Sequence, residues 1–241
     1  DNAARSTADL FVTNLQFTDS TADRDSVVRT LNLSSNGARA TSNNVNAANL
    51  QDIETLNLSG SQDLMMVVNN ADDTTASGKD DPAGFTQTAG ENLTGDLMLG
   101  ISDIGDVLGD VDGEEHSLEG TAGESDELTL ANIGDSAGIA DNVTATGFET
   151  VRLGEGIGAL TGNPTLDMAS FSGVETYIAN NIPNGVRLES VKDDVTVQIG
   201  ELDVSGNANA VSHDANVTVE GSGTVSFDVV ETYGSQIATE G

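Results

Sequence analysis

The sequence carries one short segment twice: Thr30-Leu31-Asn32-Leu33-Ser34 and, 25 positions later, Thr55-Leu56-Asn57-Leu58-Ser59. In both copies leucine alternates with Thr, Asn and Ser, which is the period-2 pattern of a strand with one buried face. A unit this short cannot bury its own apolar face, so neighbouring copies must pack against each other. The repeat therefore predicts a stack of short strands.

A second pattern recurs along the chain, in which an apolar residue precedes Glu-Thr and another apolar or aromatic residue. It occurs at 53–56, 148–151, 174–177 and 230–233. The last three copies are 26 and 56 residues apart, close to one and two units of 25–28 residues, whereas the gap of 95 before them predicts irregular coils or an insertion. In Glu54 the carboxylate has the parity of the buried residues, and burying an unpaired charge costs several kcal/mol. We therefore expect a corner or bulge between Glu54 and Leu56 that leaves this Glu at the rim, where it marks a solvated turn, accepts backbone N–H groups or binds a cation.

Further alternating stretches at 97–99, 128–130, 195–199 and 217–219 lie between Gly, Asn, Asp and Ser residues, and long helical stripes are hard to find. The predicted fold class is all-β, namely a parallel β-solenoid (β-helix-like) with short strands. Three parts are expected: N-terminal solenoid coils over 1–69, an irregular acidic Gly/Asp-rich loop segment over 70–127, and C-terminal solenoid coils over 128–241.

The composition excludes several classes of protein. The 40 Asp and Glu against 8 Lys and Arg yield a formal net charge of −32, which disfavours nucleic acid and anionic membranes as partners. Without Cys there is no disulfide framework, zinc knuckle or thiol nucleophile. No run approaches the ~20 apolar residues of a transmembrane helix, so no membrane insertion is expected. The chain begins without Met, which leads us to expect a processed product or a fragment of a larger protein.

Carboxylates interleaved with glycine crowd the stretch from 103 to 127. Gly lets carbonyl groups turn toward one point, and Ca²⁺ takes six to eight oxygen ligands, so the stretch predicts a calcium site. An EF-hand is disfavoured, because Leu108 would occupy its first ligand position. The predicted calcium ligands are Asp106, Asp110, Asp112, Glu124, Asp126 and Asp135.

Within the segment 120–130, Gly123, Asp126 and Leu128 fit the pattern G-x-x-D-x-L. Together with the Glu-Thr strands, this segment makes the chain resemble the RTX-like (repeats-in-toxin) S-layer and large adhesin proteins of Gram-negative bacteria. The resemblance implies a calcium-stabilised β-solenoid that is exported by type I secretion and assembles outside the cell. It also implies a ligand role for Asp126 and, more loosely, for Asp112 and Glu124.

Enzyme motifs are poorly supported. Residues 134–138 match the nucleophile elbow G-x-S-x-G around Ser136, but the following residues do not form a helical pattern and the only downstream His is His213. A β-helical polysaccharide lyase needs a basic residue as base and a basic groove for an acidic sugar chain, whereas the 8 basic residues are scattered. We therefore predict that the chain is not an enzyme and keep the lyase as a less favoured alternative.

The resulting functional hypothesis is a structural, self-assembling protein of the bacterial cell surface or extracellular space: an S-layer, surface-filament or biofilm-matrix subunit. Calcium would control folding and assembly together. The expected partners are further copies of the chain in an oligomer or lattice, and a cell-surface polysaccharide. The alternative is a calcium-dependent adhesin module that binds glycans or cells.

Overall fold

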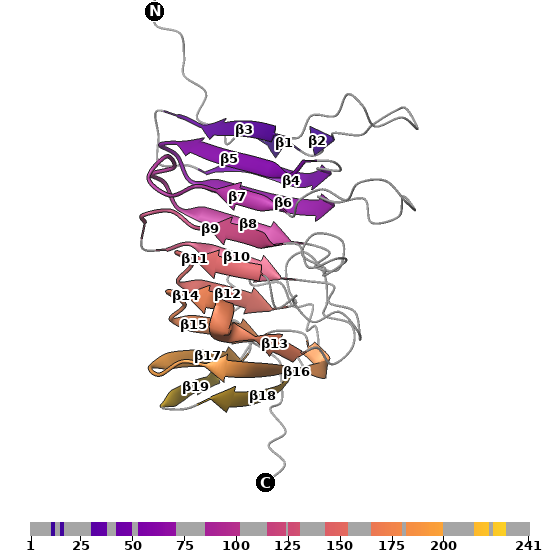
Figure 1. Ribbon diagram of the computed structural model, residues 1–241, viewed down its shortest axis with the longest axis vertical. Helices are drawn as coiled ribbons and strands as arrows, with labels where there is room; N and C mark the ends of the chain where they lie inside the picture. Colours follow the sequence, from indigo (N-terminus) through magenta and orange to yellow (C-terminus); the bar gives the residue numbers. More distant parts are fainter. Residues whose placement is uncertain are drawn as a thin grey trace, which may run out of the picture.

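Parallel strands make up most of the described chain (Figure 1). The computed structural model describes residues 11–12, 15–16, 30–37, 42–49, 53–70, 85–101, 115–123, 125–130, 143–153, 165–179, 182–199, 215–221 and 224–229. The strands within these ranges form three sheets, and every pairing between them is parallel. The all-β prediction is confirmed, and the parallel arrangement is consistent with a β-solenoid.

The largest sheet is ten-stranded, in the order β1-β4-β6-β8-β10-β12-β15-β17-β19 with β2 also paired to β4. Its strands are β1 (Phe11–Val12), β2 (Leu15–Gln16), β4 (Asn43–Asn49), β6 (Leu64–Asn70), β8 (Leu97–Ile101), β10 (Glu127–Leu130), β12 (Thr150–Leu153), β15 (Thr176–Ala179), β17 (Val195–Ile199) and β19 (Val225–Val229).

The six-stranded sheet has the order β14-β11-β9-β7-β5-β3, and the three-stranded sheet the order β13-β16-β18. The six-stranded sheet contains β3 (Thr30–Ser35), β5 (Thr55–Gly60), β7 (Thr86–Thr88), β9 (His116–Glu119), β11 (Val143–Thr146) and β14 (Phe171–Ser172). The three-stranded sheet contains β13 (Thr165–Asp167), β16 (Ile182–Val191) and β18 (Ala215–Gly221), and η1 (Met168–Ser170) is a single 3-10 turn between β13 and β14. In the part of the chain that the structure describes, no helix is long and apolar enough to span a bilayer.

From β2 onward, strands that follow one another along the chain belong to different sheets, and we call the stretch of chain from one strand to its pairing partner a coil. Paired residues are 20 positions apart between Thr176 and Thr196 and 33 apart between Leu64 and Leu97. The two TLNLS segments pair in register, Thr30 with Thr55 and Ser34 with Ser59, as the repeat predicts. The connections therefore vary in length while the strands stay aligned.

The Glu-Thr pattern marks the start of a strand in either sheet. Glu54 precedes β5 in the six-stranded sheet, whereas Glu149 and Glu175 precede β12 and β15 in the ten-stranded sheet. The 95-residue gap between Glu54 and Glu149 therefore separates two different corners of the coil, and the expectation of irregular coils or an insertion within it stays a prediction. Residues 230–233 lie outside the described residues.

Part of the predicted irregular segment 70–127 is regular. β7, β8 and β9 lie within it and continue both large sheets. Leu97, Leu99 and Ile101 of β8 are buried, which supplies the apolar column that a stacked strand needs. The prediction of a loop over the whole segment is therefore too broad, and its most acidic part, 102–114, lies outside the described residues.

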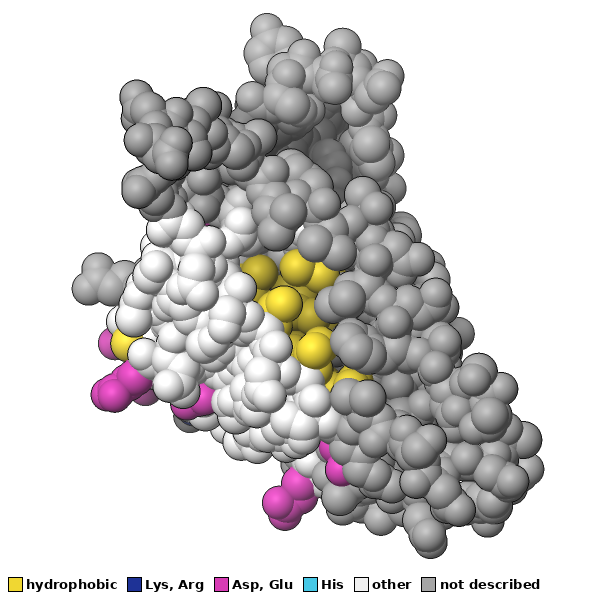
Figure 2. All heavy atoms as spheres, turned by 90° about the horizontal axis from the view of Figure 1, so that it is seen from above, with side chains coloured by type: hydrophobic (Ala, Val, Ile, Leu, Met, Phe, Trp, Pro, Cys, Tyr) yellow, Lys and Arg dark blue, Asp and Glu magenta, His cyan; other side chains and the backbone are white. Residues whose placement is uncertain are grey.

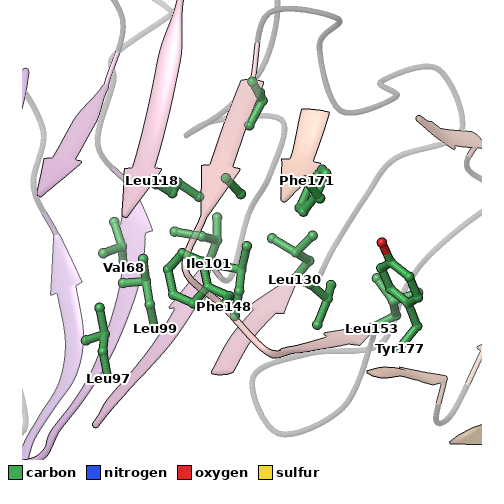
Figure 3. Close-up of a cluster of buried hydrophobic side chains, with 14 of the residues drawn as sticks. Val68, Leu97, Leu99, Ile101, Leu118, Leu130, Phe148, Leu153, Phe171 and Tyr177 are labelled. Carbon is green, nitrogen blue, oxygen red and sulfur yellow. The ribbon is translucent and has the colours of Figure 1, made fainter. Parts of the chain in front are cut away.

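The core lies between the sheets, where inward side chains of the described residues from successive coils meet. Figure 3 shows Leu118 of the six-stranded sheet in one cluster with Ile101 of the ten-stranded sheet and the corner residue Phe148. Buried polar groups are paired across coils: the side-chain amide of Gln87 donates to the carbonyl oxygen of Glu119 at 2.9 Å and accepts from its N–H at 3.0 Å. These paired bonds satisfy a side chain that would otherwise be costly to bury.

Figure 2 views the stack from above and shows hydrophobic side chains at the middle of this end, with Asp and Glu side chains at the margin. Leu31 and Leu33 of β3 are among the partly buried residues that pack on the core. At the other end of the six-stranded sheet, the ammonium group of Lys192 donates to the carbonyl oxygen of Phe171 at 2.9 Å. This bond satisfies a backbone acceptor on the edge strand β14.

Candidate functional site

The candidate site is a set of acidic side chains, the corner carboxylates Asp63, Asp96, Asp126 and Glu149. Each immediately precedes a strand of the ten-stranded sheet: β6, β8, β10 and β12, respectively. Since adjacent strands lie about 4.8 Å apart, residues at the starts of neighbouring strands are brought close together. Four acidic residues from four successive coils thereby form one column.

Asp126 closes the turn that leads into β10. It has the inward parity of Leu128 and Leu130, and its exposed fraction is 0%. Its Oδ1 accepts the N–H of Leu97 at 2.6 Å, and its Oδ2 accepts the N–H and the hydroxyl of Thr121, the latter at 2.8 Å. Hydrogen bonds to an ionised group contribute roughly 1.5–3 kcal/mol each, so these donors offset the cost of burying the carboxylate.

Glu149 and Asp63 link coils in the same way. Oε2 of Glu149 accepts the N–H of Asp126 at 2.8 Å, and Oδ1 of Asp63 accepts the N–H of Asp96 at 3.1 Å. The expectation that a Glu of the repeat accepts a backbone N–H at a corner is therefore confirmed for Glu149. Each of these carboxylates accepts a backbone N–H of an adjacent coil, as the backbone carbonyl groups do within the sheet.

Asp96 is the electrostatically strained member of the column. Burial raises the pKa of the Asp96 carboxyl above its usual value, and the nearby carboxylates of Asp63 and Asp126 raise it further. Its ionised form is disfavoured by both causes, so a proton held by Asp96 relieves repulsion within the column. The chemistry of the site is therefore hydrogen-bond acceptance by Asp63, Asp126 and Glu149, together with proton affinity at Asp96.

Two glycines make room for this arrangement. A Cβ on Gly120 would lie 2.0 Å from the carbonyl oxygen of Gly147, and one on Gly123 would lie 2.8 Å from Oδ1 of Asp96. Real Cβ atoms do not approach another atom this closely. The glycines of the sequence motif therefore serve close packing between coils, which the calcium interpretation of the motif did not anticipate.

Of the six predicted calcium ligands, one lies within the described residues. This residue is Asp126, whose carboxylate accepts hydrogen bonds from Leu97 and Thr121. Its role as a calcium ligand stays a prediction. The other predicted ligands lie outside the described residues: Asp106, Asp110, Asp112, Glu124 and Asp135. Among the residues that are described, no three His, Cys, Asp or Glu side chains form a group that could hold a metal ion.

The sequence contained a signal for Asp63 and Asp96 that was not used. Both occur in the tripeptide Asp-Leu-Met, at 63–65 and 96–98, directly before a strand. The paired residues Leu64 and Leu97 place these two tripeptides side by side. A search for short identical segments would have found this pair, whereas a search for Gly-spaced carboxylates did not.

Of the two histidines, only His116 lies within the described residues, and it is not part of the motif around Ser136. His116 is buried, and its Nδ1 accepts the N–H of Phe85 at 3.0 Å, so this ring nitrogen binds the main chain of the neighbouring coil. Ser136 and His213 lie outside the described residues.

The chain was also compared with known proteins. No protein-family model, curated protein sequence or solved structure matches it.

Proposed function

We propose that the chain is a parallel β-solenoid that serves as a structural, self-assembling protein of the bacterial surface or extracellular space. The observation that carries this proposal is the column arrangement of the coils. Identical segments pair in register from Thr30–Thr55 to Ser34–Ser59, and their side chains bond to each other, Asn57 to Asn32 at 2.8 Å and Ser59 to Ser34 at 2.7 Å.

Such columns favour a scaffold because each coil contacts only its neighbours and presents the same groups at a fixed period. The buried polar groups near the corners also serve cohesion, since Asp126 and His116 bind the main chain of adjacent coils. A long surface with a repeating pattern suits contacts between many identical copies better than recognition of one small molecule.

Calcium dependence forms part of the proposal and rests on the sequence, namely the net charge of −32 and the Gly-spaced acidic stretch. The column of corner carboxylates supports it physically. Burial, and after it the carboxylates of Asp63 and Asp126, disfavour the charged form of Asp96, so added positive charge near this column would favour the folded state.

Far-UV circular dichroism and negative-stain electron microscopy test the proposal, with the purified chain in Ca²⁺, in chelator, and in Mg²⁺ at matched ionic strength as the control. We expect Ca²⁺ to raise the thermal midpoint and to produce sheets or fibres, with a smaller effect of Mg²⁺. Folding and association that are both indifferent to chelation would contradict the proposal. A monomer that folds with Ca²⁺ and never assembles would favour the adhesin alternative.

A further inference from the structure

The outward side of the six-stranded sheet is almost free of charge. Along its strands the burial alternates, so every second side chain points away from the core. Within these described strands the outward residues are Thr, Ser or Asn, with Glu119 as the single charged exception. We call the uncharged set the neutral face: Thr30, Asn32, Ser34, Thr55, Asn57, Ser59, Thr86, Thr88, Ser117, Thr144, Thr146 and Ser172.

The neutral face is ordered in columns. Asn57 donates to Asn32 at 2.8 Å and accepts from the hydroxyl of Thr88 at 2.9 Å, which links three successive coils. The strand pairing also places Ser117 beside both Thr86 and Thr144. Hydroxyl and amide groups therefore recur about every 4.8 Å along the stack.

The carboxylate of the exception, Glu119, lies near the backbone of Ala89 and Gly90. Its Oε2 accepts the N–H of Ala89 at 3.3 Å, and its Oε1 lies 2.9 Å from the position that a Cβ on Gly90 would take. The carboxylate thus lies against the main chain at the corner of the preceding coil.

Charged side chains occur on both other sheets, although most described outward residues of the ten-stranded sheet are also uncharged. On the three-stranded sheet Arg187 forms ion pairs with Glu189, at 2.8 Å, and with Glu220. On the ten-stranded sheet Arg152 pairs with Glu127 at 2.8 Å. In a chain with a net charge of −32, the neutral face is therefore a described surface that carries no charged side chain of its own.

We propose that the neutral face binds the neutral face of a second copy of this chain. The proposal rests on the proposed function and names the surface through which self-association occurs. Two strongly acidic molecules repel each other in most orientations, and the repulsion is smallest where the facing surfaces carry no carboxylates. A second copy also has the same period, so hydroxyl and amide columns meet along the whole sheet in a two-fold arrangement.

The size of the face sets the strength of the contact. Six strands of two to six residues cover about 400 Å² per copy at ordinary strand dimensions, or about 800 Å² for a pair. Stable complexes bury about 1,200–2,000 Å², so one pair is weak on its own. Association becomes strong when several contacts act together in an array.

Substitutions at Thr144 test the proposal, because this residue is exposed on β11, the strand of the neutral face next to the edge strand β14. Thr144→Glu and Thr144→Lys each place the same charge on both copies across a two-fold contact. Ser226→Glu and Ser226→Lys are the matched controls, since Ser226 is an exposed hydroxyl residue on β19 of the ten-stranded sheet. Sedimentation equilibrium over a wide concentration range, in Ca²⁺, measures self-association, and circular dichroism establishes that each variant is folded.

We expect both Thr144 variants to raise the dissociation constant of the dimer roughly tenfold or more, whatever the sign of the charge, and the controls to match the wild type. An equimolar mixture of Thr144→Glu and Thr144→Lys should regain association, because opposite charges then face each other. Ser172→Glu and Ser172→Lys repeat the test at a second exposed position on β14 and replace it where a Thr144 variant does not fold.

Three results would overturn the inference. If the wild type associates and the variants associate equally well, another surface is used and the proposed function still stands. If the wild type stays monomeric in Ca²⁺ at every concentration, both the inference and the proposed function fail. If a monomeric wild type is retained on an insoluble neutral glucan and Thr144→Glu abolishes retention, the occupant is a glycan instead of a second copy.

Discussion

The buried carboxylate of Asp126 offers the sharpest test of how the coils are held together. In Asp126→Ala the backbone N–H groups of Leu97 and Thr121 lose their acceptor inside the protein. A buried donor left unsatisfied costs roughly 1–3 kcal/mol, so the two together cost about 4 kcal/mol. For a chain of this length 1 kcal/mol corresponds to roughly 2–4 °C, and the midpoint should fall by roughly 8–16 °C.

Asp126→Asn refines the test. The amide retains one acceptor oxygen but turns an NH2 group toward a second donor, so about one hydrogen bond is lost and the expected cost is about 2 kcal/mol. Asp228→Ala is the matched control, because it removes a carboxylate of the same kind at an exposed position on β19. Surface substitutions of this kind stay within about 0.5 kcal/mol.

Thermal melts followed by circular dichroism at pH 7 and fixed calcium concentration provide the measurement. The expected order of midpoints is wild type and Asp228→Ala together, then Asp126→Asn, then Asp126→Ala. If Asp126→Ala melts with Asp228→Ala, the hydrogen bonds to Asp126 do not hold the coils together and the reasoning is refuted.

Two further substitutions probe the same corner. Because the folded state raises the proton affinity of Asp96, protonation of this carboxyl stabilises the fold as the pH falls through its raised pKa, and its ionisation costs stability above that pKa. Asp96→Asn should therefore raise the thermal midpoint at pH 7 by roughly 2–4 °C, for a repulsion of up to about 1 kcal/mol. It should also remove this part of the pH dependence of stability. A lower midpoint than wild type at pH 7 would contradict the destabilising role of the Asp96 charge. Gly120→Ala places a Cβ 2.0 Å from a backbone oxygen and should lower the free energy of unfolding in urea by about 3 kcal/mol or more. In the control Gly37→Ala the Cβ meets only the flexible side chain of Gln62, at 3.0 Å. Equal effects of the two substitutions would argue against close packing at Gly120.

The repeat and the alternation of side chains were sufficient to predict the all-β class. In β3 and β5 the leucines point inward and Thr, Asn and Ser point outward, as the period-2 pattern requires. This property is local, because successive side chains of any strand point to opposite faces. The equivalent pairing of Thr30 with Thr55 follows from the identity of the two segments.

The grouping of strands into sheets depended on the whole fold. The Glu-Thr pattern looks alike at Glu54 and Glu149, yet it starts a strand of the six-stranded sheet in one case and of the ten-stranded sheet in the other. A local pattern cannot specify which corner of the coil a segment occupies, because the connections between strands differ in length. The sheet to which a segment belongs is therefore decided by the tertiary structure.

The sequence by itself determined the strand pattern, the acidity and the presence of carboxylates at strand starts. The tertiary structure decided what those carboxylates do: Asp126 accepts the N–H of Leu97, 29 residues away, and Asp63 accepts the N–H of Asp96, 33 residues away. It also decided that the outward residues of the six-stranded sheet form one neutral surface. The carboxylate contacts and the neutral surface have the same physical reason: stacking brings together groups from successive coils, and the separation of these groups along the chain is irregular.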